Sequence, residues 1–584
     1  MKPPPTKLWR ILRRGLTGLG VCLILIGLFY AEEDWRGDRA WKNCKRALQA
    51  QGAKLDWADF IPAQVPEDDN VFGVPEMQKW FVAGPAGEVA GWQASELAEK
   101  MSYPGYEEGS RTARLVVARL TICLPGASLS ANSGATVLQW GKPQARAEAA
   151  RIIKEALGPV VTDPAGFNLM LRSPEEIRPA QIFLQCQTAP TAEELRQFLP
   201  EPIANTADPD SEKIQVEPAG NGCFVATMLA PDTVAKFLEW NEQLEPDFAL
   251  IRRALQRPYV RINGDYSSPL EIPAPNVVAV HHVSQRLAVM AQCHLAQGKP
   301  EEALRDLTLL HDLCRILEGS RPMTLLPAFM NAAFQKFYVD TIAEGLRQHA
   351  WREPQLAVLE EQLKQINLLL PLKQSVETER ATYCYIMERQ YPPLGVRHYV
   401  LHFFTLDSWR DRLDDVLETL NPRGWVNQNL VAGVNLFTNA IGALDPASQL
   451  IFPDKAAAAI REANEVDSEH YPYTLSPAFM ITNYLNYCQT TARNQTIVNQ
   501  ALAACALERF HLEHGEYPDT LAPLAPRFLA AIPHDVIGGQ PLHYRRAADG
   551  TFVLYSVGWN GRDGGGTRGK TVADGDWVWP FFDP

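Results

Sequence analysis

The chain has 584 residues, of which 46% are hydrophobic and 21% are charged, which is the composition of a globular protein. It is too long for a single hydrophobic core, so we expect several domains. The formal net charge of −13 argues against non-specific nucleic-acid binding, which needs a basic surface to neutralise phosphates. We therefore expect no nucleic-acid partner.

The N-terminus carries the pattern of a membrane anchor. Basic residues between Lys2 and Arg14 precede an uncharged run, Gly15–Ala31, and three acidic residues follow it. This order predicts a single-pass helix with its basic end in the cytoplasm and the remaining chain outside it. A cleaved signal peptide is the alternative, but it would place the large Phe29 at a position that favours small residues. The predicted location is the inner (cytoplasmic) membrane, with an extracytoplasmic, periplasmic body.

Two regions follow residues 1–31. Residues 32–75 begin with a polar helical pattern and continue as a Pro/Asp-rich stretch, which indicates a spacer. Residues 76–274 have a mixed pattern that predicts an α+β region. Its expected strands are Leu115–Ile122 and Gly222–Leu229, and its expected helices are Ala145–Leu157 and Thr191–Phe198.

Residues 275–480 show apolar residues at helical spacing. The junction Gly298-Lys299-Pro300 separates two such stretches, and the residues around it resemble the helix-turn-helix junction of a tetratricopeptide repeat. The later helices show no clear repeat period, so the pattern predicts a layer of helical hairpins in which one unit resembles such a repeat. These later helices are expected over Pro322–His349, Pro354–Leu370, Leu372–Gln390 and Trp409–Leu420.

Residues 481–584 read as a helix, a stop at Gly515, a short β-meander and a glycine-rich loop. From about Tyr484 onward this order resembles the globular part of the major pseudopilins of type II secretion systems. The resemblance implies a helix with a small antiparallel sheet. Gly20 stands where a prepilin would carry glutamate, and more than 400 residues separate the anchor from this region, so we expect no pilin-type processing. The predicted fold class is multidomain α+β.

The pseudopilin resemblance also implies a calcium site in the glycine-rich loop. By match to the family pattern, Asp574 is the best ligand, Asp563 and Asp576 are further ligands, and Asn560 replaces an aspartate of the family. Calcium needs about six to eight oxygen ligands, so the loss of that charge would weaken the site. The alternative is a metal-free loop held by Asx turns, with arginines of the loop pairing with the carboxylates.

No catalytic motif stands out. The sequence contains no G-x-S-x-G, S-x-x-K or H-E-x-x-H pattern. His281 and His282 are adjacent and point about 100° apart on a helix, and His294 and His311 lie in apolar helical context, which favours core or boundary roles. The ten cysteines are scattered, without a CxxC pair, and are expected to be buried free thiols.

These features favour a non-enzymatic function. The expected function is a membrane-anchored scaffold or adaptor of the bacterial cell envelope, associated with a secretion or pilus-like apparatus and with protein partners there. The opening Glu33-Asp34-Trp35-Arg36-Gly37 is similar to that of anchored proteins of planctomycete- and verrucomicrobia-type bacteria, and no activity comes with that similarity. One alternative is an anchored envelope hydrolase with a site between the α+β and helical regions. Another is a calcium-stabilised ligand-binding protein.

Overall fold

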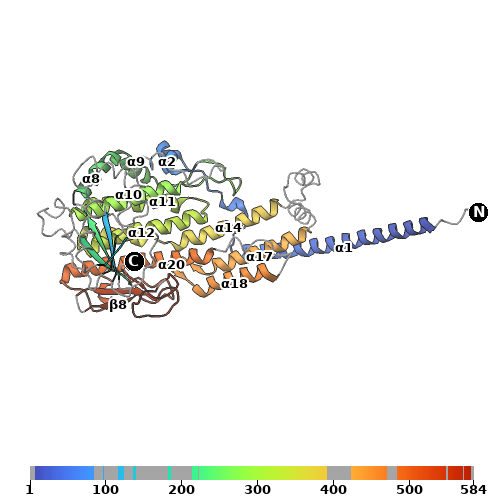
Figure 1. Cartoon of the computed structure of the whole chain (residues 1–584). Helices are drawn as coiled ribbons and strands as arrows, with labels where there is room; N and C mark the ends of the chain where they lie inside the picture. The colour runs from blue at the N-terminus through green and yellow to red at the C-terminus, as the bar shows by residue number, and fades with distance from the viewer. Residues whose placement is uncertain are drawn as a thin grey trace, which may run out of the picture.

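The computed structural model describes most of the chain, and it is mostly helical with small sheets. The described residues are 7–83, 97, 116–123, 136–139, 182–185, 214–220, 223–229, 231–390, 422–469, 483–547, 550–569 and 571–579. In Figure 1 the helices α10, α11, α12, α14 and α20 lie roughly alongside one another in a stack, and one long helix projects away from it.

The α-helices are α1 Lys7–Ala50, α2 Pro75–Phe81, α8 Pro231–Asn241, α9 Glu245–Leu255, α10 Val277–Ala296, α11 Pro300–Gly319, α12 Leu325–Arg347, α13 Glu353–Gln365, α14 Leu369–Gln390, α17 Arg423–Ile441, α18 Pro453–Glu469 and α20 Tyr484–His514. The strands are β1 Val116–Cys123, β2 Thr136–Gln139, β3 Ile182–Gln185, β4 Ile214–Gly220, β5 Cys223–Leu229, β6 Leu444–Asp445, β7 Leu450–Ile451, β8 His543–Arg546, β9 Phe552–Ser556 and β10 Trp577–Val578.

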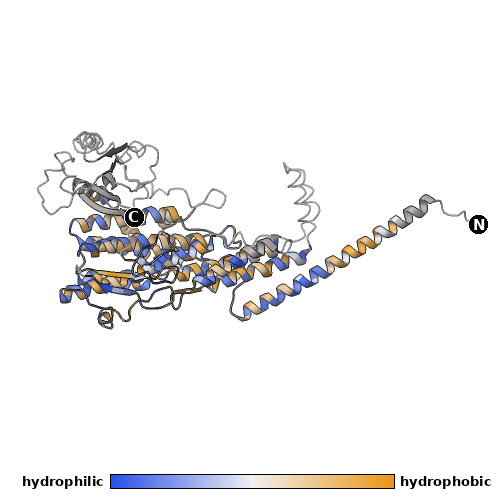
Figure 2. Cartoon of the chain, turned by 60° about the horizontal axis from the view of Figure 1, so that its bottom comes forward, coloured by the Kyte–Doolittle hydropathy of each residue, from blue (hydrophilic) through white to orange (hydrophobic). Residues whose placement is uncertain are grey.

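Helix α1 has two unlike halves. Its part from Gly15 onward is the one described helix long and apolar enough to cross a membrane, and the apolar window is not covered by the rest of the molecule. Large side chains there are open to solvent, such as Leu16 at 62% and Ile24 at 64%. Figure 2 shows this apolar stretch on the projecting part of the helix. The predicted N-terminal apolar helix is thus present.

The second half of α1 packs against the body without a break in the helix. Glu33 is buried and its carboxylate accepts a hydrogen bond from the Trp425 indole, at 3.1 Å. The Asp34 carboxylate accepts from the backbone N–H of Gly424, at 2.8 Å, and so caps the start of α17. Farther along, Trp41 and Leu48 are buried in the same cluster as α14 and α17. The acidic residues that end the apolar run therefore fix α1 to α17.

The spacer predicted over residues 32–75 also contributes to the hydrophobic core. Short 3-10 turns follow α1 and bury Trp57 and Phe72. The Trp57 indole donates to the Tyr266 carbonyl, at 2.8 Å. The Asn70 amide donates to the Arg261 carbonyl, at 2.7 Å, so this stretch is fixed to the segment that leads into α10.

The hairpin predicted around Gly298 is present as α10 and α11. Gly298 has φ of +69°, which glycine adopts without strain, and Pro300 begins α11, where its missing N–H would have no helical partner. His294, near the end of α10, contacts the buried Asp306 of α11 through Nδ1, at 2.9 Å. Burial raises the pKa of Asp306, and His294 offsets part of that cost. His294 therefore joins the two helices, as the boundary role predicts.

The later helices match the predicted ones closely, with α12, α13 and α14 in the expected places. The strands expected at Leu115–Ile122 and Gly222–Leu229 are β1 and β5, which pair antiparallel in a five-stranded sheet of order β2-β3-β1-β5-β4. In that sheet β3 runs parallel to both of its neighbours. The helices expected at 145–157, 191–198 and 409–420 lie outside the described residues.

Helix α20 is the central element of the fold. Its residues belong to both hydrophobic clusters of the described chain, and it packs against α12, α13, α14 and α18. Polar side chains on it bind neighbouring backbone: Gln495 accepts from the Leu368 N–H at 2.7 Å, and Gln500 donates to the Trp577 carbonyl at 2.6 Å. The helix ends at Gly515, whose φ of +78° suits a left-handed cap.

The C-terminal region has the predicted helix followed by a small antiparallel sheet. The strand order is β10-β9-β8, with β9 in the centre. Tyr517 and Trp579 are buried in the same cluster as the α20 residues, so this sheet shares its core with the helical stack. The cysteines of the described helices are free, and five of the seven are buried, as expected.

Candidate functional site

The glycine-rich loop wraps around one carboxylate. Asp576 is buried, with 2% of its surface exposed. Its carboxylate oxygens accept hydrogen bonds from the backbone N–H groups of Gly564, Gly566 and Thr567, at 2.6–3.2 Å. Gly566 has φ of +83°, a conformation that points its N–H inward at little cost. Backbone amides thus compensate the buried carboxylate, as in an anion-binding nest.

The other three predicted ligands lie toward the surface of the same loop. Asp563 accepts from the Tyr555 hydroxyl at 3.0 Å and from the Gly565 N–H at 2.8 Å. These hydrogen bonds, the backbone one first, lower the pKa of Asp563. Asn560 accepts from the N–H two residues on, at 2.9 Å, and Asp574 accepts from the Thr571 hydroxyl, at 2.8 Å.

Two of these contacts are Asx turns, which the metal-free alternative for this loop requires. Asp563 and Asn560 each accept from the N–H two positions ahead. Arg568 donates to the Val578 carbonyl, at 3.4 Å. The loop therefore carries a hydrogen-bond network that holds its shape through the protein's own groups.

A different set of residues forms the tightest group of metal-binding side chains in the described part of the chain. Ligand atoms of His349, Glu508 and His511 all lie within 4.8 Å of one another. Glu508 and His511 are three positions apart on α20, so they share a face of that helix. His349 follows the end of α12, more than 150 residues earlier in the chain.

The turn after α12 fixes the position of His349. The N–H of Ala350 returns to the Gly345 carbonyl and that of His349 to the Leu346 carbonyl, which is the Schellman pattern of a helix end. His349 occupies the left-handed position of this motif, with φ of +49°, where glycine is the usual residue. The next turn is anchored by Trp351, which is fully buried and donates to the Ile342 carbonyl at 3.0 Å.

Glu508 lies at the centre of the group. It is 2% exposed, and its Oε1 contacts His349 Nδ1 at 2.7 Å. Its other oxygen, Oε2, accepts from the Tyr517 hydroxyl at 2.8 Å, which fixes the orientation of the carboxylate. Burial, and the Glu508 charge after it, raise the pKa of Tyr517, so that hydroxyl remains a donor.

His511 is stacked between two rings. Its imidazole lies 5.4 Å from the His349 ring and 4.7 Å from the Tyr517 ring, centroid to centroid. The Nδ1 atom of His511 is buried and has no hydrogen-bond partner among the residues that the structure describes. A buried polar nitrogen without a partner costs about 1–3 kcal/mol, so it calls for an explanation.

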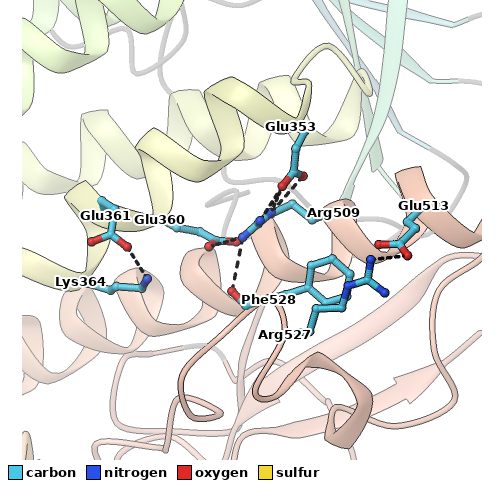
Figure 3. A network of polar contacts seen from close by, with 8 residues as sticks. All are labelled: Glu353, Glu360, Glu361, Lys364, Arg509, Glu513, Arg527 and Phe528. Carbon is cyan, nitrogen blue, oxygen red and sulfur yellow. Dashed lines mark hydrogen bonds and ion pairs between the residues drawn. The ribbon is translucent and has the colours of Figure 1, made fainter.

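An ion-pair network lies beside this group on α20. Figure 3 shows Arg509 reaching the carboxylates of Glu353 and Glu360 on α13. Its Nε is 2.9 Å from Glu353, and its Nη1 is 2.7 Å from Glu360, which is 3% exposed. Burial raises the pKa of Glu360 to about 7, because the cost of burying its charge exceeds the attraction of Arg509. Arg509 is thus directed to α13.

The histidines singled out in the sequence have packing roles. His281 lies against Phe334 and Phe337, and His311 contacts Asp312 at 3.4 Å and packs on Tyr338. The His349–Glu508–His511 group was not predicted. Its local signal was the Glu-x-x-His spacing at Glu508 and His511, which places a carboxylate and an imidazole on one helix face.

No family model, curated protein or solved structure matches the chain.

Proposed function

We propose that the protein is a scaffold or adaptor anchored in a membrane by α1. The observation that carries this proposal is the continuity of α1. Its apolar half is uncovered, and its second half is fixed to α17 through Glu33 and Asp34. Such a helix would join a bilayer to a large stack of helices.

The proposed location is the inner membrane of a bacterial envelope, with the body on the periplasmic side. The basic N-terminal flank supports this orientation. The pseudopilin-like order of α20 and the β8–β10 sheet supports a place beside a secretion or pilus-like apparatus. The hydrolase alternative needs a site that includes the region 76–274, most of which lies outside the described residues.

Membrane extraction and topology together test the anchor. The full chain should remain in the membrane pellet after alkaline extraction, whereas a variant lacking residues 15–31 should be released. A reporter fused at the C-terminus should report a non-cytoplasmic location. A cytosolic reporter, or a full chain that stays in the soluble fraction with its N-terminus intact, would refute the anchored topology.

Native mass tests the adaptor role. After mild solubilisation, the protein should migrate in an assembly larger than its own mass, with an envelope protein in fixed stoichiometry. The matched control is the variant lacking residues 15–31, which keeps α17 but loses the anchor. Migration of the full chain as a single species without a partner would count against an adaptor.

A further inference from the structure

We propose that His349, Glu508 and His511 form a binding site for a divalent metal ion of the zinc class. Two imidazoles and one carboxylate are a donor set that zinc uses in proteins, with a fourth position left to water or another ligand. The three groups come from α20 and from the turn after α12, and their ligand atoms converge within 4.8 Å. This site is separate from the glycine-rich loop and from the proposed anchor.

The first supporting observation is the buried Nδ1 of His511, which no group in the described part of the chain hydrogen-bonds. His511 is held in place by ring stacking on Tyr517 and His349. In the tautomer that carries its proton on Nε2, this nitrogen has a free lone pair that a cation can accept. Metal coordination would satisfy this atom.

The second observation is the environment of Glu508. Its carboxylate is 2% exposed, and the neighbouring Arg509 is directed to α13. The Tyr517 hydroxyl donates to Oε2 and leaves Oε1 facing His349. A donor to the second oxygen of a ligating carboxylate is a common means of orienting it toward a metal. A divalent cation would also supply the positive charge that a buried carboxylate needs.

The third observation concerns His349. Its side chain is 55% exposed, so an ion would reach the site from solvent past this residue. The ion would replace the hydrogen between His349 Nδ1 and Glu508 Oε1, which are 2.7 Å apart. Zinc ligands lie about 2.0–2.2 Å from the ion, so in a tetrahedral site these two atoms would stand about 3.4 Å apart and would have to separate by about 0.7 Å. An exposed side chain can make that adjustment.

Metal binding to the purified full chain, in detergent and without a polyhistidine tag, tests the proposal. We expect one Zn²⁺ per chain by titration against a chromophoric chelator at pH 7.5. Co²⁺ in its place should give a visible ligand-field spectrum. His349→Asn removes one ligand, and Asn tolerates the left-handed backbone, so the fold should persist. This variant, and His511→Asn, should lower zinc affinity by about tenfold or more.

His514→Asn is the matched control, because His514 lies about one helical turn beyond His511 on the same helix but outside the proposed site. Its Nδ1 lies 2.9 Å from the Phe510 carbonyl oxygen. This control should bind zinc as the unaltered protein does. Zn²⁺ should also raise the melting temperature of the unaltered protein and of His514→Asn, and should raise that of His349→Asn by less at the same zinc concentration. The absence of stoichiometric binding, or equal affinity in His349→Asn and His514→Asn, would overturn the proposal.

Discussion

Gly37 of α1 and Gly424 of α17 bring the two helix backbones into direct contact. A methyl group on Gly37 would lie 2.1 Å from the Gly424 carbonyl oxygen, and one on Gly424 would lie 1.9 Å from the Glu33 carbonyl oxygen. Both distances are far shorter than any real carbon–oxygen contact. Only glycine at both positions allows the anchor helix to approach the body this closely.

Gly37→Ala should therefore destabilise the docking of α1. We expect a loss of about 1–3 kcal/mol, because the two helices must move apart to admit the methyl group. Thermal unfolding of the detergent-solubilised chain measures this loss. Gly27→Ala is the control, since a methyl group there meets no atom within 4 Å. Equal melting temperatures for the two variants would show that the close approach is not required.

Asp576→Ala should unfold the C-terminal loop. The change removes the acceptor for the N–H groups of Gly564, Gly566 and Thr567, whose hydrogen bonds to it are part-buried, and each donor left without an acceptor is costly. We expect about 2–4 kcal/mol of destabilisation, measured by chemical denaturation. Asp574→Ala, at an exposed position where the carboxylate accepts a hydrogen bond from the Thr571 hydroxyl, should cost less than about 1 kcal/mol. The reverse ranking would contradict this account of the loop.

Calcium should have little effect on the melting temperature of the protein. The Asp576 oxygens already accept backbone hydrogen bonds, and Asp563 and Asn560 accept in Asx turns. A cation would have to displace these donors. Melting in calcium and in chelator should therefore coincide. A rise of several degrees with calcium, lost in Asp574→Asn, would instead establish the site that the pseudopilin resemblance implies.

Arg509→Met should destabilise the contact between α20 and α13. It leaves Glu360 buried without its cation, so we expect a loss of about 2–4 kcal/mol at pH 8. Arg527→Met is a matched control: both guanidinium groups lie over the Phe528 ring, but Arg527 pairs with Glu513 at the exposed surface (Figure 3). That variant should lose less than about 1 kcal/mol. Similar losses would show that burial of Glu360 is unimportant.

Glu360→Gln should change the pH dependence of stability. The native pKa of Glu360 is raised from 4.5 to about 7, so the folded state binds more protons than the unfolded state between these values. The contribution of Glu360 to stability is therefore largest below pH 4.5 and falls, by up to about 3 kcal/mol, as the pH rises to 7. Glutamine removes this dependence. Melting curves from pH 5 to pH 8 should diverge for the two proteins, and parallel curves would contradict the raised pKa.

The sequence was sufficient to predict elements whose signals are local. The apolar run, the Gly298–Pro300 junction and the Gly515 stop each carry their own physical cause, so α1, the α10–α11 hairpin and the end of α20 were expected. The sequence also predicted strands close to the bounds of β1 and β5. Local signals also placed a glycine-rich loop around the residues near Asp576, although not its backbone donors.

Relationships between distant segments could not be predicted in this way. In the sequence, the acidic residues after Ala31 indicate the end of the anchor. The helix instead continues through Glu33, whose buried carboxylate accepts a hydrogen bond from Trp425, almost 400 residues away. The pairing of His349 with Glu508 spans 159 positions and depends on how α12 packs against α20. Spacing within one helix gives Glu508 and His511, but only the packed fold supplies the third group.

The unbroken α1 has a mechanical consequence. Its contacts with α17 begin inside the apolar run, where the Phe29 ring lies 6.3 Å from the Trp425 ring, and continue at Glu33 and Asp34. No flexible linker therefore separates the apolar half of α1 from the folded body. With the apolar half inserted in a bilayer, the folded body would lie close to the lipid headgroups, and its orientation relative to the membrane plane would be fixed. A force applied to the helical stack would then be transmitted to the bilayer through the continuous helix, whereas a flexible linker would absorb it.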